Sequence, residues 1–324
     1  MSSIELPPQS RLPLDWRSAG QSFFSLNFFL RQKFGRRVWK ISLDGGLDCP
    51  NRDGTLDTAG CVFCDPASFS PSRRRGIKSI ADQRDDGMRR LRTRYRAEGF
   101  VAYFQPGTNT YAPAERLRVL YQQAISHPDV VGLAVGTRPD CVSDEVLDLL
   151  GAFARRTWVS VEYGLQSVHD RTLKRLNRHH CYADFLDAHQ RSRRRGLTVA
   201  AHVILGLPGE SREDMRATAG ELARLGIDSV KLHNLYAVRN TPLAAMVASG
   251  EVEFCGLDEY AGCVVDFLEL LPPDCVIDRL SGDAPPQYLV GPTWCLDKPA
   301  VRAAVEAEFR RRDTWQGRKH GGKL

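Results

Sequence analysis

Short apolar runs alternate along this chain with longer segments in which apolar residues recur at helical spacing. This alternation predicts repeated βα units around a parallel sheet. The predicted strands cover residues 38–43, 101–104, 130–135, 158–162, 199–205 and 229–235, and the predicted helices lie near residues 80–98, 113–126, 143–155, 182–195, 212–225 and 257–271. Six such units are too few for a closed eight-stranded barrel. The expected fold class is therefore α/β, with a partial (β/α)6 TIM-like barrel.

The segments outside these units complete the expected organisation. Residues 1–36 predict an N-terminal helical segment with an apolar stripe of Phe23, Leu26 and Leu30, and residues 37–272 form the barrel. Residues 273–315, rich in proline and glycine before a basic helix at 300–312, predict a C-terminal extension that caps the open side of the barrel. Residues 316–324 predict a disordered basic tail.

The longest early apolar stretch, residues 23–30, is too short for a membrane span and is interrupted by Asn27. Arg31 and Lys33 follow it where a signal peptide would place small residues for cleavage. The nine cysteines are an odd number without a small disulfide-rich framework, which indicates a reducing compartment. We therefore expect a cytoplasmic protein with no membrane partner.

The polar residues of the predicted barrel gather where its strands end. Polar segments at 105–110, 137–140 and 206–210 follow the second, third and fifth predicted strands, Glu162 and Gln166 follow the fourth, and His233 and Asn234 close the sixth. Active sites of βα barrels lie at the carboxyl ends of the strands. We therefore expect the functional site at this end of the barrel.

A cysteine-rich loop follows the first predicted strand, with thiols at Cys49, Cys61 and Cys64. Soft thiolates select iron–sulfur clusters, zinc or copper(I). A structural zinc site or an electron-transfer cluster normally takes four protein ligands, so three leave one coordination position for a cofactor. A CxxC pair alone also occurs as half of a zinc site or as a thioredoxin-like redox pair. The sequence supplies neither a second CxxC nor a downstream histidine pair at zinc-finger spacing, and a redox pair would have no use for Cys49.

Seven motifs spread over most of the chain resemble those of a known family. They span residues 40–54, 60–64, 103–111, 137–141, 162–166, 202–210 and 282–285. These motifs are similar to those of radical S-adenosylmethionine (SAM) enzymes, specifically the YhcC/YtqA-type family, which is related to the radical SAM domain of the Elongator catalytic subunit. The gap between Cys49 and Cys61 is longer than the three-residue gap of the common radical SAM motif.

The resemblance implies a [4Fe-4S] cluster held by Cys49, Cys61 and Cys64, with SAM bound to its open iron. An external electron donor such as flavodoxin or ferredoxin would reduce the cluster. Reductive cleavage of SAM then gives methionine and a 5'-deoxyadenosyl radical, which abstracts hydrogen from the substrate. The residues expected to bind SAM are Gln105, Gly107, Thr108, Asn109, Arg138, Glu162, Gln166, Ile204, Gly206 and Pro208.

Several of these assignments have structural alternatives. Glu162 either binds the SAM ribose or ammonium group or pairs with Arg138, and Arg138 either binds a carboxylate or ties its loop to Asp140. Residues 204–210 either line the adenine or form a plain strand-to-helix turn. The usual Gly-Gly-Glu motif is absent after the second strand.

The implied substrate is tRNA, at a modified wobble uridine whose 5-carboxymethylaminomethyl side chain is remodelled toward an aminomethyl group. The net charge of +6 and arginine clusters at 73–75, 89–96, 191–195 and 310–312 favour a nucleic-acid substrate modestly. A GC-rich genome explains the arginines equally well. One alternative is a radical SAM enzyme acting on a small metabolite or a protein side chain. The other is a non-catalytic metal-binding module that binds RNA.

Overall fold

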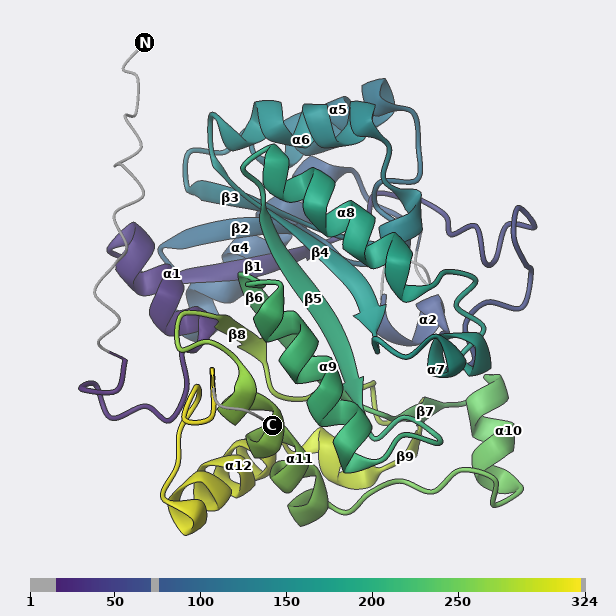
Figure 1. Cartoon of the computed structure of the whole chain (residues 1–324). Helices are drawn as coiled ribbons and strands as arrows, with labels where there is room; N and C mark the ends of the chain where they lie inside the picture. The colour runs from purple at the N-terminus through teal and green to yellow at the C-terminus, as the bar shows by residue number, and fades with distance from the viewer. Residues whose placement is uncertain (1–15, 71–75, 322–324) are drawn as a thin grey trace.

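Seven parallel strands form a single curled sheet in the computed structural model, which describes residues 16–70 and 76–321 (Figure 1). The strand order is β1-β2-β3-β4-β5-β6-β8. The strands are β1 (Val38–Leu43), β2 (Gly99–Phe104), β3 (Val130–Thr137), β4 (Trp158–Gln166), β5 (Thr198–Leu205), β6 (Ser229–Asn234) and β8 (Val276–Arg279). The sheet and its covering helices confirm the expected partial barrel.

Each predicted strand of the six is present, and a seventh was missed. β8 pairs in parallel with β6, so residues 276–279 belong to the sheet and not to an extension outside it. This strand has four residues and lies in a segment rich in proline and glycine, where a period-two pattern is too short to recognise. The predicted boundary at residue 273 therefore separates β8 from the sheet to which it belongs.

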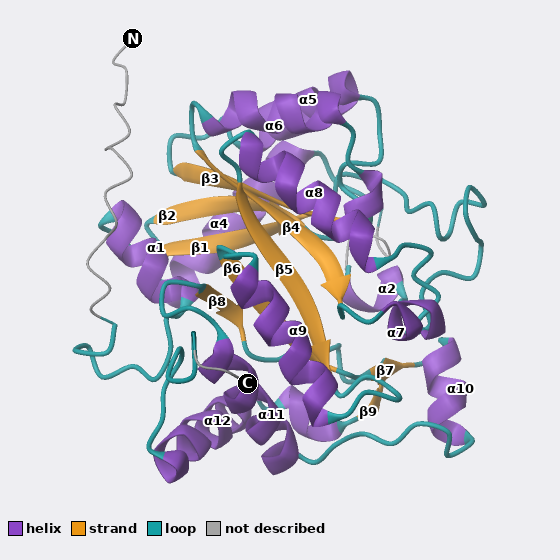
Figure 2. Ribbon diagram, viewed as in Figure 1, coloured by secondary structure: helices purple, strands orange, loops and turns teal. Residues whose placement is uncertain are grey.

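Helices cover the convex face of the sheet (Figure 2). The barrel helices are α4 (Ile80–Tyr95), α5 (Ala114–Ala124), α6 (Asp144–Ala154), α8 (Tyr182–Arg194), α9 (Arg212–Arg224) and α11 (Leu257–Leu270). Ser143 and Ser211 cap α6 and α9 by accepting backbone N–H bonds from the first turn. Gly87 lets α4 lie close on β1, because a Cβ there would sit 2.5 Å from Ile41 Cγ2.

The N-terminal helix α1 (Leu26–Phe34) packs at the amino end of the strands. Its Leu30 is buried in a cluster with Val101 and Tyr103, and the Phe29 ring contacts Trp158 at the start of β4. A single parallel bridge also joins Ser25 to Ile277 of β8. This segment therefore closes the floor of the half-barrel.

Smaller elements surround the other end of the barrel. They are α2 (Pro66–Phe69), the turn η1 (Pro139–Cys141), α7 (Asp170–Arg175), the antiparallel pair β7 (Ala237–Val238) and β9 (Leu289–Gly291), α10 (Pro242–Ala248) and the turn η2 (Thr293–Leu296). The basic helix α12 (Lys298–Arg312) lies beside α11 (Figure 1). No helix among the described residues is long and apolar enough to cross a membrane.

The tail that follows α12 is ordered through residue 321, in contrast to the predicted disorder. Gln316 is 1% exposed, and its amide accepts from Phe24 N–H at 2.9 Å and donates to Pro272 O at 2.7 Å and Cys275 O at 2.8 Å. These three bonds fix the tail to the N-terminal segment and to the turn before β8. The low hydrophobicity of the tail concealed this single buried side chain.

We expect Gln316→Ala to destabilise the protein by about 2–4 kcal/mol, because it leaves three buried backbone groups without their partners. Urea unfolding measures the change. His320→Ala, at an exposed position in the same segment, is the control and should stay within about 0.5 kcal/mol of wild type. Equal stability of the two variants would contradict the role given to Gln316.

Candidate active site

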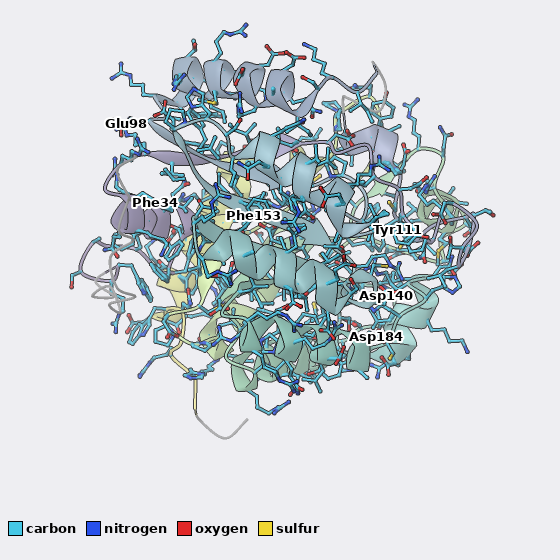
Figure 3. The ribbon with its side chains drawn as sticks, turned by 90° about the horizontal axis from the view of Figure 1, so that it is seen from above. Phe34, Glu98, Tyr111, Asp140, Phe153 and Asp184 are labelled. Atoms are coloured by element: carbon cyan, nitrogen blue, oxygen red, sulfur yellow. The ribbon has the colours of Figure 1, made fainter. Side chains whose placement is uncertain are left out.

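A cavity of about 710 Å³ opens at the carboxyl ends of the strands, inside the curl of the sheet. In Figure 3, which views the molecule from above, Tyr111 and Asp140 lie after the strands on the right and Glu98 lies at the opposite end on the left. The residues predicted from the sequence that line it are Cys49, Cys61, Cys64, Gln105, Gly107, Thr108, Arg138, Gln166 and Ile204. Asp283, Ala284 and Pro285 of the late motif also line it.

Four predicted SAM contacts are not part of the cavity lining: Asn109, Glu162, Gly206 and Pro208. Asn109 is fully buried and donates to Gly136 O at 2.8 Å, so it braces the loop after β2. Gly206 and Pro208 belong to the turn between β5 and α9, which fits the structural alternative for that segment. Glu162 is fully buried among charged side chains inside the barrel.

The cysteine loop is held against the segment that follows α7. Asn177 donates to Asp57 Oδ2 at 2.6 Å and to Gly60 O at 2.9 Å, and its own carbonyl accepts from Asn51 Nδ2 at 2.7 Å. Bonds from Asn177, the Ala59 backbone and then His179 hold the pKa of Asp57 well below its usual range. The loop that carries the three thiols is therefore fixed by contacts from a different βα unit.

Two side chains donate N–H groups to the sulfur of Cys61. Arg178 Nη1 lies 3.2 Å from it and Asn51 Nδ2 lies 3.5 Å from it. Arg178 is itself fixed by a 2.7 Å bond from Nη2 to Gly164 O. A side chain on Gly164 would crowd this arrangement, because a Cβ there would sit 2.9 Å from Gln166 Nε2 and 3.2 Å from Arg178 Nη2.

The three thiols influence one another. Burial raises the pKa of Cys64 to about 12, the negative charge of Cys61 adds to the rise, and Cys49 adds less. Three thiolates in one pocket require a compensating positive centre, and N–H donors to a ligating sulfur are typical of iron–sulfur sites. The donor set therefore fits an iron–sulfur cluster. Among the described residues, no three His, Cys, Asp or Glu side chains are placed to hold a single metal ion, so ligation by these cysteines stays a prediction.

Arg138 ties its loop to Asp140, which is one of the two roles that the sequence allowed for this arginine. Its Nε and Nη2 lie 3.0 and 2.8 Å from the two carboxylate oxygens, and Nη2 also donates to Arg178 O. The third nitrogen, Nη1, is buried without a partner in the described structure, in a residue that lines the cavity. This nitrogen leaves one donor for a bound ligand.

A network of charged side chains lies below the cavity, inside the barrel. Glu162 accepts from Lys40 at 2.6 Å and lies 2.8 Å from His202 Nε2, so it pairs with these residues and not with Arg138. Its second oxygen also accepts from Lys231 at 3.2 Å. Lys40 reaches Asp278 at 2.5 Å, which joins β1 and β8, the two edges of the open sheet.

The pKa values of the residues in this network depend on their burial and on the charges of their neighbours. Burial acts to raise the pKa of Glu162, but Lys231 and Lys40 hold it well below its usual range. Burial lowers the pKa of Lys231 to about 8, with Glu162 acting against the fall. Burial, followed by the positive charge of Lys231, lowers the pKa of His202 to about 4. The histidine is therefore neutral near pH 7.

Sequence analysis missed most of this network, although a signal was present. Lys231 and His233 stand two positions apart in β6, so they share one face of a buried strand. Strands of a parallel sheet are covered on both faces and are normally apolar throughout. A lysine and a histidine alternating within such a strand therefore indicate a polar interior, as does Lys40 within β1.

Two family models match this chain. The Radical SAM superfamily model covers residues 54–222, and the Radical_SAM C-terminal domain model covers residues 227–311. The solved structure of Elp3 from the archaeon Methanocaldococcus infernus superposes with a TM-score of 0.64 at 17% identity, over 86% of this chain and 64% of that one. The fold and the site thus define a radical SAM enzyme.

Curated relatives place the chain more closely. It is 37% identical to the uncharacterized protein YtqA of Bacillus subtilis over 94% of this chain and 95% of the relative, and 40% identical to YhcC of Escherichia coli over 83% and 86%. A tRNA uridine(34) acetyltransferase of Dehalococcoides mccartyi is 28% identical over 59% of this chain and 42% of its own length. The chain belongs to the family of YtqA and YhcC within the radical SAM superfamily.

We expect stability to fall on acidification between about pH 6.5 and pH 4. In this window the unfolded state protonates its histidines, whereas His202 in the native state stays neutral down to about pH 4. The loss from this residue approaches about 3 kcal/mol at the acid end. Urea unfolding at pH 7 and pH 5 should show a smaller drop for His202→Gln than for wild type. His320→Gln, at an exposed site, should keep the wild-type drop, and an unchanged drop in His202→Gln would contradict the prediction.

Proposed function

We propose that the enzyme binds SAM and a [4Fe-4S] cluster in this cavity and acts on a wobble uridine of tRNA. The observation that carries the proposal is the meeting of the three thiols with the ends of β2 to β6 around one cavity. Cys49, Cys61 and Cys64 would hold the cluster, which would supply the electron for reductive cleavage of SAM to methionine and a 5'-deoxyadenosyl radical. The walls of the cavity hold the substrate carbon near the radical and keep water away.

Support for tRNA comes from the partial relatives that act on uridine 34 and from the size of the cavity. The acetyltransferase of Dehalococcoides mccartyi shares sequence with this chain over 59% of its length, and its name refers to tRNA uridine 34. A cavity of about 710 Å³ has the size of typical small-molecule sites and leaves space for a nucleoside side chain beside SAM. The reaction proposed is the remodelling of a 5-carboxymethylaminomethyl side chain toward an aminomethyl one. The 5'-deoxyadenosyl radical would take a hydrogen atom from the carboxymethyl CH2, one electron would return to the cluster, and water would then release the two carbons as glyoxylate.

The arginine clusters do not contribute to this support. The arginines at 89–96 and 191–195 end α4 and α8, which lead directly into β2 and β5 and so lie at the end of the barrel opposite the cavity. Several form ion pairs, such as Arg191 with Asp187 at 2.7 Å and Arg193 with Asp228 at 2.5 Å. On α12, Arg312 likewise pairs with Asp266. The cluster at 73–75 lies outside the described residues.

Anaerobic reconstitution with iron and sulfide, followed by dithionite and SAM, tests the radical chemistry. We expect 5'-deoxyadenosine and methionine from wild type and none from Cys64→Ala, because the cluster then loses one of its three ligands. Cys263→Ala, a buried thiol of α11, is the matched control and should retain turnover. Bound iron without SAM cleavage in wild type would favour the non-catalytic metal-binding module.

The same assay with added tRNA tests the substrate. We expect bulk tRNA carrying the carboxymethylaminomethyl group to stimulate 5'-deoxyadenosine formation, and mass spectrometry of the digested tRNA to show the aminomethyl nucleoside. Cleavage of SAM that no tRNA stimulates or alters would favour a small metabolite or a protein side chain as substrate.

The reduction potential of the reconstituted cluster tests the role of Arg178. A charge-assisted N–H bond to Cys61 stabilises the additional negative charge of the reduced cluster. We therefore expect Arg178→Met to lower the midpoint potential by about 50 mV, which corresponds to about 1 kcal/mol for one electron. Titration monitored by electron paramagnetic resonance measures it. Arg175→Met, which removes a surface pair with Glu251, should leave the potential unchanged.

A further inference from the structure

The lining of the cavity is strongly cationic. Among its described lining residues, the carboxylate is that of Asp283, and the arginines and lysines are Arg52, Arg138, Arg178, Lys231, Arg279 and Lys298. These cations fall into three groups by what they face. Only one of the groups lacks a matching negative charge.

The first group faces the cysteines. Arg52 and Arg178 both act to lower the pKa of Cys64, and Arg138 is paired with Asp140 at 2.8 Å. The thiolates therefore face Arg52 and Arg178, and Asp140 balances Arg138. The second group is Lys298 on the rim, which pairs with Asp283 at 3.0 Å and is largely exposed. Neither set leaves an excess of positive charge in the buried part of the cavity.

The third group, Lys231 and Arg279, lies on the floor together with Lys40. The carboxylates that these cations meet are Glu162 and Asp278, and Lys40 contacts both at 2.6 and 2.5 Å. Three cations thus face two carboxylates. The nearby histidines do not change the balance, because burial lowers the pKa of His202 and of His233. The floor therefore carries one uncompensated positive charge, which is costly in a buried position.

Arg279 holds that excess charge. Its Nη2 lies 2.5 Å from Nδ1 of the neutral His233 ring, its Nε is buried without a partner, and none of the described carboxylates forms an ion pair with it. Gly282 lies against the same pair, where a Cβ would sit 2.8 Å from His233 Nδ1 and 3.2 Å from Arg279 Nη2. A guanidinium with free donors at the edge of a cavity is a binding group for a planar anion.

A carboxylate on the substrate fits this position better than the other anions that enter the cavity. The methionine carboxylate of SAM belongs near the cysteines, where Arg138 Nη1 is free. An RNA phosphate is attached to the sugar, on the opposite side of the nucleoside from the base side chain. If the base side chain enters the cavity first, the phosphate therefore stays near the mouth of the cavity. We propose that Arg279, with Lys231 beside it, forms a subsite on the barrel floor that binds a carboxylate of the substrate side chain. This inference rests on the proposed function, since it assigns the part of the substrate that reaches the floor.

Binding to the SAM-loaded, reconstituted enzyme tests the subsite. The RNA probes are anticodon stem-loops that carry either 5-carboxymethylaminomethyluridine or its carboxamide at the wobble position, and the RNA-free probes are sarcosine and sarcosinamide. For wild type, calorimetry should show about tenfold tighter binding of the carboxylate stem-loop than of the carboxamide. This preference should disappear in Arg279→Gln and persist in part in Arg279→Lys, which keeps the charge. Circular dichroism establishes that both variants are folded.

Lys298→Gln is the matched control, since it removes a cation from the rim of the same cavity. It should keep the full carboxylate preference, and an equal loss in this variant would overturn the proposal in favour of a general field effect. The proposal would also be overturned if Arg279→Gln kept the preference for the carboxylate stem-loop, or if wild type bound the two stem-loops equally well. Either result would leave tRNA as the substrate. A matching loss of SAM affinity in Arg279→Gln would assign the guanidinium to SAM and overturn it too.

Failure of the proposed function gives a different result. In one such result, neither stem-loop binds, but sarcosine raises the melting temperature of wild type while sarcosinamide does not, and sarcosine has no effect on Arg279→Gln. The subsite then stands and the tRNA substrate does not. If no probe distinguishes carboxylate from amide in wild type, the subsite is overturned.

Discussion

The ion pairs of Lys40 with Glu162 and Asp278 determine how the sheet can curl. Lys40 stands on β1 and Asp278 on β8, at opposite edges of the sheet, yet their charged atoms are in contact. A buried carboxylate such as Glu162 is tolerated only with partners, and its partners come from β1, β5 and β6. The curvature that satisfies these charges also brings the strand ends around one cavity, so the polar interior and the shape of the site have a common origin.

The fold was largely predictable because its strands have strong local patterns. Runs such as 130–135 are apolar and rich in valine, and Ser143 and Ser211 mark helix starts through local chemistry. β8 and the buried Gln316 depend on long-range contacts with β6 and Phe24, which no local pattern reports. Tertiary structure thus decided the elements that local propensity left undetermined.

The site was predictable where a motif concentrates unusual chemistry and less so where single residues act through geometry. Cys61 and Cys64 are visible as a spaced pair, whereas Arg178 becomes meaningful only once a separate βα unit brings its guanidinium to Cys61. Glu162 was identified as functional at a strand end, but the inward side of β4 buries it among cations. Which charged side chains meet across neighbouring strands depends on how the sheet is assembled. The sequence shows only which residues alternate within one strand.

The contact between Gln316 and Phe24 has a consequence for the order in which the barrel is completed. The segment that leads into α1 is held by the side chain of Gln316, which lies 292 residues after Phe24 in the sequence. On the ribosome, the floor beneath the charged network therefore stays without this brace until residue 316 has been synthesised and has left the exit tunnel. The sealing of the barrel from below therefore cannot precede the synthesis of this segment, and a cluster assembled earlier would rest on an interior still open to water.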